Sequence, residues 1–198
     1  MKRLILVTSP PASGKTYISK QLAKALKHVV YLDKDTLIVL SHQIFKLANA
    51  EVNRSSDFFE QHIRNYEYQA TLALAMEALD YDDIVLINAP FTREIRDTAY
   101  IDNLKSQLLE KNARLTVVWV ETDVDVVKQR MIERDSPRDT WKLENWDEYI
   151  KGVDFSIPHC IDNPEVVDDL LLFKNSNQAQ YQQSMQQILS VLEASHKP

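Results

Sequence analysis

The stretch that decides the fold is Ser9–Thr16, with the sequence SPPASGKT, which begins one residue after the apolar run Leu4–Val7. The chain has only two glycines among its 198 residues, and one of them, Gly14, lies in this octet. A polyphosphate needs several backbone N–H groups converging on it, with the positive end of a helix behind them. Glycine fits where backbone must lie close to phosphate, because it has no Cβ. The octet therefore predicts a phosphate-binding loop between a buried strand and a helix.

Backbone donors in this loop would come from its second half. Pro10 and Pro11 have no N–H group and would instead stiffen the first half. In such a loop Lys15 would bridge the β- and γ-phosphates, and the Thr16 hydroxyl would bind Mg²⁺. The alternative is a tight turn whose lysine points to solvent. The predicted nucleotide-binding residues of this segment are Ala12, Ser13, Gly14, Lys15, Thr16 and Tyr17.

Composition and charge restrict the class of protein. A content of 44% hydrophobic and 26% charged residues is ordinary for a globular chain, and the length suits one domain. No apolar run is long enough to span a membrane, and the apolar stretch near the N-terminus is too short for a signal peptide. The single cysteine, Cys160, excludes an intrachain disulfide and predicts a cytoplasmic location. A net charge of −6 argues against a nucleic-acid partner, and the five histidines lack metal-ligand spacing. Nothing in the sequence indicates the oligomeric state.

Apolar runs and helical patterns alternate along the chain, which predicts an α/β fold with a parallel sheet. The predicted strands are Leu4–Val7, Val29–Leu32, Ile84–Ile87 and Leu115–Val120, with His159–Ile161 as a weaker fifth. The predicted helices are Thr16–Leu26, Asp57–Leu79, Thr92–Leu109, Asp123–Arg134 and a last one aligning Tyr181, Met185, Ile188 and Leu192. Ligands of such sheets bind at the carboxyl ends of the strands, so the residues after each run are the candidate site.

The octet resembles the Walker A motif of P-loop NTPases, with Ser9 in place of the usual first glycine and Ala12 in place of a frequent middle one. Its PASGK segment is most similar to the P-loop small-molecule and polynucleotide kinases, a group that includes AAA-type ATP-binding and zeta-toxin-like proteins. The resemblance implies a three-layer sandwich in which helices cover both faces of a five-stranded parallel sheet of order 2-3-1-4-5. It also implies one domain over residues 1–198, with a small lid at about 130–143.

An acid pair follows the second predicted strand. Asp33 and Asp35 would lie on the same side of an extended segment. Two carboxylates there suit phosphoryl transfer, one orienting a hydrated metal and the other accepting a hydroxyl proton. By its resemblance to the Asp-x-Asp of small-molecule kinases, Asp33 would hold a metal-bound water and Asp35 would face the acceptor hydroxyl. The alternative is that one of the two only caps a helix starting near Thr36.

Asn88 follows the third predicted strand, where a Walker B aspartate would be expected. An amide can bind a metal-coordinated water but brings no negative charge, so Asn88 would be a weak metal contact through water. Metal binding would then depend more on Thr16 and Asp33. Arg93 and Arg96 come next and would either bind an anionic acceptor or pair on the surface with Glu94 and Asp97.

Three arginines follow the fourth predicted strand. Arg130 and Arg134 share a helical face, and Arg138 lies on the next loop. This spacing resembles the lid of P-loop kinases, whose arginines stabilise the charge of the transferred group. Arg134 and Arg138 are the predicted phosphate contacts, and Arg130 the structural one. Aromatic residues that would pack at the base of the lid are Trp141, Trp146 and Tyr149.

Taken with the resemblance, these residues predict an ATP- and Mg²⁺-dependent kinase that moves the γ-phosphoryl group to a hydroxyl of a small molecule. The predicted catalytic residues are Lys15, Asp35, Arg134 and Arg138, and Arg134 would also bind the nucleotide. Three alternatives remain open: an ATPase without an acceptor, a polynucleotide kinase and a sugar-nucleotide kinase. Candidate acceptor-binding side chains between the second and third strands are His42, Arg54, His62, Arg64 and Tyr66, and Asp162 and Asn163 would lie near the adenine.

Overall fold

A computed structural model describes residues 2–136, 139–157 and 169–194. Its centre is the predicted parallel sheet of five strands, and the predicted order β2-β3-β1-β4-β5 is confirmed. The strands are β1 (Lys2–Thr8), β2 (Val29–Asp33), β3 (Ile84–Asn88), β4 (Ala113–Glu121) and β5 (Asp169–Lys174).

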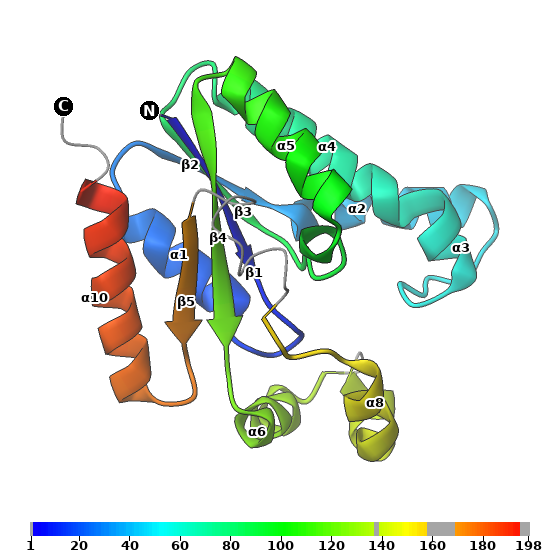
Figure 1. Ribbon diagram of the computed structural model, residues 1–198. Coiled ribbons are helices and arrows are strands. Elements are labelled where there is room, and N and C mark those ends of the chain that lie inside the picture. Colours follow the sequence, from blue (N-terminus) through cyan, green and yellow to red (C-terminus); the bar gives the residue numbers. More distant parts are fainter. Residues whose placement is uncertain (1, 137–138, 158–168, 195–198) are drawn as a thin grey trace.

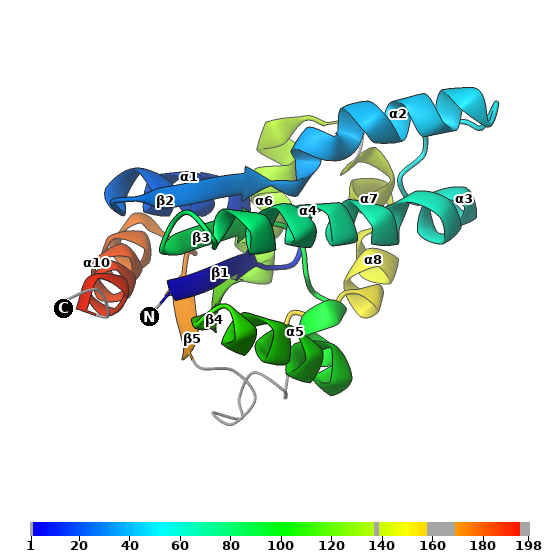
Figure 2. The same ribbon diagram turned by 90° about the horizontal axis from the view of Figure 1, so that it is seen from above.

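Helices cover both faces of the sheet, which explains why its strands are apolar throughout. In β1, Leu4 and Leu6 pack against α4 (Asn65–Ala78) and α5 (Thr98–Glu110). Ile5 and Val7 face the other way, toward α1 (Lys15–Ala25) and α10 (Gln178–Ala194). Figures 1 and 2 show this three-layer arrangement.

The strand register brings polar residues together at the carboxyl edge of the sheet. Asn88, the last residue of β3, pairs with Val7 of β1 and with Asp33, the last residue of β2. The loop that leaves β1 therefore starts beside Asp33 and Asn88. Helices α6 (Val124–Arg134) and α8 (Trp146–Gly152) lie beyond the carboxyl ends of β4 and β5 (Figure 1), and the short α7 (Thr140–Glu144) comes between them in the chain.

The fifth strand is not the segment that the sequence suggested. His159–Ile161 lies outside the described residues, as do Asp162 and Asn163. The strand next to β4 is Asp169–Lys174, whose Leu170 pairs with Val117. Its apolar run is rich in leucine, which also favours helices, so the run carried a weak strand signal.

The predicted helix Asp57–Leu79 is interrupted by a π-helical turn. It consists of α3 (Asp57–Phe59), a π turn over Glu60–Arg64 and α4, and it starts with the Ser56 side chain accepting from the backbone N–H of Phe59. A π turn inserts one extra residue and rotates the helix face that follows. At uninterrupted helical spacing Tyr66 and Leu74 would share a face with the buried Phe59 and Ile63, but both are exposed, while Tyr68 and Ala75 are buried instead.

One further helical segment differs from expectation, and another matches an alternative that the sequence left open. The predicted helix Thr92–Leu109 is a 3₁₀ turn over Glu94–Arg96 followed by α5, because Asp97 caps α5 by accepting from the Tyr100 N–H. The alternative of a helix starting near Thr36 is met by the 3₁₀ turn Lys34–Leu37 and helix α2 (Ile38–Leu47), and Figure 2 shows that α2 extends away from the sheet together with α3. Within the described ranges, no helix is long and apolar enough to cross a membrane.

Candidate active site

The loop between β1 and α1 adopts a backbone that suits anion binding. Ala12 and Gly14 both have positive φ angles, of 61° and 92°, and α1 begins at Lys15. The first N–H groups of a helix have no acceptor within it, and in α1 these belong to Lys15, Thr16 and Tyr17. The loop therefore presents backbone donors and a helix N-terminus to the same space.

The Ser13 carbonyl anchors this loop from behind. It accepts hydrogen bonds from Thr122 Oγ1 at 3.0 Å, Asn175 Nδ2 at 2.8 Å and Arg130 Nη1 at 3.2 Å. Arg130 also donates to the Asn175 carbonyl at 2.7 Å. Arg130 thus has the structural position expected of it, while the contributions of Thr122 and Asn175 were not foreseen.

These contacts give a second reason for the glycine. A Cβ at Gly14 would lie 2.4 Å from Asn175 Nδ2, and the φ angle of 92° would strain any other residue. The sequence predicted that Gly14 makes room for phosphate. The structure adds that the absence of a Cβ also leaves room for Asn175, which holds the loop by the Ser13 carbonyl.

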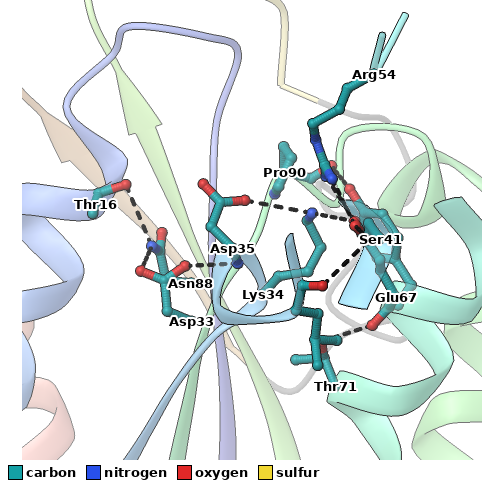
Figure 3. A network of polar contacts seen from close by, with 12 residues as sticks. Thr16, Asp33, Lys34, Asp35, Ser41, Arg54, Glu67, Thr71, Asn88 and Pro90 are labelled. Atoms are coloured by element: carbon teal, nitrogen blue, oxygen red, sulfur yellow. Dashed lines mark hydrogen bonds and ion pairs between the residues drawn. The ribbon is translucent and has the colours of Figure 1, made fainter. Parts of the chain in front are cut away.

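Asn88 links the loop to the end of β2 (Figure 3). Its Oδ1 accepts from Lys15 Nζ at 3.0 Å, and its Nδ2 donates to Thr16 Oγ1 at 3.3 Å and to Asp33 Oδ2 at 3.0 Å. The side chain is almost fully buried, so these bonds satisfy groups that would otherwise be costly to bury. One amide therefore contacts three of the predicted site residues.

The two carboxylates of the acid pair have different surroundings. Asp33 ends β2, and a 3₁₀ turn over Lys34–Leu37 follows, so the pair does not lie on one extended segment as predicted. Asp33 Oδ1 caps that turn by accepting from the Asp35 N–H at 3.0 Å. Its Oδ2 faces the site and also accepts from Tyr31. The capping role and the site role are thus divided between two oxygens of Asp33.

Some of the side chains around Asn88 carry oxygen atoms suited to bind a small hard cation. Mg²⁺ prefers oxygen ligands and keeps several waters, and the Thr16 hydroxyl and the Asp33 carboxylate both lie against Asn88. Asn88, however, presents its amide nitrogen to these two groups and its oxygen to Lys15. In this arrangement Thr16 and Asp33 are the residues that would hold the ion, with phosphate oxygens and water, and Asn88 would orient them.

A cavity of about 670 Å³ opens beside the loop. Among the described residues that line it, six are cationic and one, Asp35, is a carboxylate. For a chain of net charge −6, this is a marked local reversal of sign, and it favours an anionic ligand. The charged lining residues are Lys15, Lys34, Asp35, Arg54, Arg130, Arg134 and Lys142.

A buried ion network supports the side of the cavity away from the loop. Glu67 of α4 accepts from Lys34 Nζ at 2.7 Å and from both terminal nitrogens of Arg54 at 2.7 Å, and Ser41 donates to it as well. Lys34 Nζ also lies 3.5 Å from Asp35 Oδ1. Burial alone would raise the pKa of Glu67, but the bonds from Arg54 and Lys34 lower it to about 2. Glu67 thereby fixes two cations of the cavity wall.

We expect Glu67→Gln to destabilise the protein by about 3 kcal/mol, because it removes the closer and more deeply buried of the two carboxylates that pair with the buried Lys34. The pKa of Glu67 is about 2 in the fold against an ordinary value of 4.5. Its contribution is therefore complete above pH 4.5 and is lost as the pH falls toward 2. Between pH 7 and pH 3, the free energy of unfolding measured in urea should fall less for the variant than for the wild-type protein. Glu77→Gln, an exposed change on α4, is the control, and equal losses in both variants would contradict the assignment.

The lid arginines are only partly described. Arg134, at the end of α6, lines the cavity and pairs with Asp139, whereas Arg138 lies outside the described residues. Of the aromatic residues expected to pack at the base of a lid, Trp146 and Tyr149 have their rings 5.6 Å apart, whereas Trp141 is exposed.

The remaining candidate residues divide into those that line the cavity and those that do not. Arg93 pairs with Glu60, and Arg96 pairs with Asp154, so neither has the partner that was expected nor lines the cavity. Among the candidate acceptor residues, Arg54 lines the cavity. Those that do not line it are His42, His62, Arg64 and Tyr66. Tyr17 lines it, with its ring 5.8 Å from that of Tyr181.

Solved structures with the same fold include several kinases. A protein from Chloroflexus aurantiacus j-10-fl, classed provisionally as a kinase, is 19% identical, with a TM-score of 0.62 over 98% of this chain and 97% of that one. Shikimate kinase from Bacteroides thetaiotaomicron is 13% identical, with a TM-score of 0.53 over 97% and 98%. Kti12 from Chaetomium thermophilum, solved with ADP-AlF3, is 21% identical, with a TM-score of 0.52 over 94% and 97%. At these identities the likeness concerns the fold.

Comparison at the level of sequence families identifies the group. A search of the curated proteins found no match. The profile of one family, described as an AAA domain, matches residues 4–155. This range is most of the chain, and it contains the loop at Ser9–Thr16 together with Asp33, Asn88 and Arg134. The chain therefore belongs to the AAA domain family and has the P-loop NTPase fold of the kinase type.

Proposed function

We propose that the protein transfers the γ-phosphoryl group of ATP to a hydroxyl of a small molecule. The observation that carries this proposal is that one cavity contains both the phosphate-binding loop and Asp35. Figure 3 shows Asp35 between the Thr16–Asn88 group and the Arg54–Glu67 group. An acceptor hydroxyl placed against Asp35 would face phosphates bound at Lys15 and the start of α1.

Each group then has a defined part. Asp35, with its side chain 56% exposed toward the cavity, would accept the proton of the attacking hydroxyl. Lys15 and Arg134 would stabilise negative charge on the transferred group. Mg²⁺ bound at Thr16 and Asp33 would neutralise phosphate charge. The opposite wall, with Ile38, Arg54, Ser55 and Pro90, would bind the acceptor.

A second candidate is a nucleotide-binding protein or ATPase without an acceptor. Asn88 favours it, because the amide replaces a metal-binding acid and holds Lys15 and Asp33 in a neutral network. Polynucleotides and sugar nucleotides are alternative acceptors, and the acidic balance of the chain argues against the former.

The test is ADP formation from Mg·ATP in the presence of separate acceptor classes. These are polyols and sugars, hydroxy acids, nucleosides, sugar nucleotides and an oligonucleotide with a free 5′-hydroxyl. The proposal expects one small-molecule class to raise the rate and to yield a phosphorylated product by mass spectrometry. Hydrolysis at the same rate with every acceptor, unaffected by Asp35→Asn, would instead support the second candidate.

A further inference from the structure

Asp139 is an aspartate that precedes a helix but does not cap it with its carboxylate. It occupies the N-terminal cap position of α7, where an aspartate ordinarily accepts a hydrogen bond from the helix backbone. Its side chain makes no such bond, although it is fully buried. The carboxylate is directed instead at two cationic side chains.

The two cations approach different oxygens of Asp139. Arg134 donates from Nε to Oδ2 at 2.8 Å and also from Nη2 to the same oxygen. Lys142 donates from Nζ to Oδ1 at 3.1 Å. The side chains of Arg134 and Lys142 remain 33% and 24% exposed, and both line the cavity that contains the phosphate-binding loop. The Asp139 carboxylate is therefore buried, and the Arg134 and Lys142 side chains face the cavity.

We propose that Lys142 is a second phosphate-binding cation of the lid and that Asp139 is the positioning residue that holds Lys142 and Arg134 toward the cavity. The inference rests on the proposed function for the transfer step, but its binding part concerns nucleotide phosphates alone. It also gives a role to the segment after Arg134 that does not depend on Arg138.

The charge balance favours this role over a purely structural one. A single carboxylate neutralises one cation, so the cluster of Asp139, Arg134 and Lys142 has a net positive charge toward the cavity. Burial alone would raise the pKa of Asp139, but the hydrogen bonds from Arg134 and Lys142 keep it below the usual value, so the group is ionised at neutral pH. Lys142 Nζ also lies 5.8 Å from the centre of the Tyr149 ring, which restricts it further. Both cations are thus oriented before a ligand arrives, which lowers the entropy cost of binding.

As a partner of Arg134, which would stabilise the transferred group, Lys142 would contact the terminal phosphates of the nucleotide, and this role predicts a specific pattern of nucleotide affinity. A cation that contacts the phosphates farthest from the base affects ATP more than ADP. We expect Lys142→Met to weaken Mg·ATP binding by about 10- to 100-fold, as for a hydrogen bond to a charged group, and ADP binding by clearly less. Lys142→Arg should restore most of the ATP affinity. Lys151→Met removes an exposed lysine of the neighbouring α8 and should leave both affinities unchanged.

Asp139→Asn is expected to lower kcat by about 10²-fold through misplacement of Arg134 and Lys142, and to weaken ATP binding in the same direction. The matched control is Asp147→Asn, an exposed change on α8. Calorimetric titration with ATP and with ADP gives the affinities. Variants are compared only where their melting temperature matches that of the wild-type protein.

Unchanged ATP affinity in Lys142→Met, or equal losses for ATP and ADP, would overturn the role of Lys142. Normal kcat and ATP affinity in folded Asp139→Asn would overturn the positioning role. If Asp139→Asn does not fold, Lys142→Met and Lys142→Arg still decide the binding claim. Failure of the wild-type protein to phosphorylate any acceptor would contradict the proposed function. The titrations would still show whether Lys142 binds nucleotide phosphates.

Discussion

Lys15→Ala is expected to lower the rate of phosphoryl transfer by about 10²- to 10³-fold, the range for loss of one donor aimed at developing charge. Lys15 is the cation supplied by the phosphate-binding loop itself, and it begins α1. Its Nζ lies 3.0 Å from Asn88 Oδ1, beside the groups that would hold the metal. Because the charge on the transferred group grows during transfer, we expect kcat to fall more than ATP affinity.

The measurement is kcat from steady-state kinetics together with the ATP dissociation constant from titration. Lys20→Ala is the matched control, since Lys20 lies exposed on the same helix. A Lys15→Ala protein that is folded and transfers phosphoryl groups within a few-fold of the wild-type rate would contradict the assignment of this loop.

Asp35→Asn is expected to lower acceptor-dependent kcat by about 10²- to 10⁴-fold, the usual contribution of a positioned general base. The amide has nearly the same shape but cannot take a proton from the acceptor. ATP affinity should change little, because Asp35 lies between the phosphate side and the Arg54–Glu67 side of the site (Figure 3).

Two observations separate a base from a merely structural carboxylate. In the base role, the variant should retain wild-type ATP affinity and the same melting temperature. Asp102→Asn, which removes an exposed carboxylate on the distant α5, should leave kcat unchanged. Loss of ATP binding in parallel with kcat would instead assign Asp35 to nucleotide or metal binding.

The features that the sequence predicted best follow from local pattern or from the general geometry of a parallel sheet. The phosphate-binding loop is one continuous strand-loop-helix unit, so its place after β1 and before α1 follows from local pattern. Asn88 and Asp33 could be placed together because parallel strands end at the same edge, and their register confirms it. The sheet order came from the family resemblance and is confirmed.

The features that were missed depend on distant contacts. Asn175 follows β5, and with that strand unrecognised its bond to the Ser13 carbonyl could not be inferred. Lys34 was passed over because lysines are rarely buried, and its burial depends on Glu67, which is 33 residues away along the chain. Asp139 is the exception, because its partners Arg134 and Lys142 are only five and three residues away in the chain. Its burial became visible once α6 and α7 were placed together.

The most direct test of the central claim is the stoichiometry of the reaction once an activating acceptor is known. With γ-labelled ATP, phosphorylated acceptor, free phosphate and ADP are quantified in the same sample. Transfer at this site predicts one phosphorylated acceptor for each ADP, with free phosphate as a minor product. Equal amounts of ADP and free phosphate, with no labelled acceptor, would show that the site hydrolyses ATP and would contradict the account.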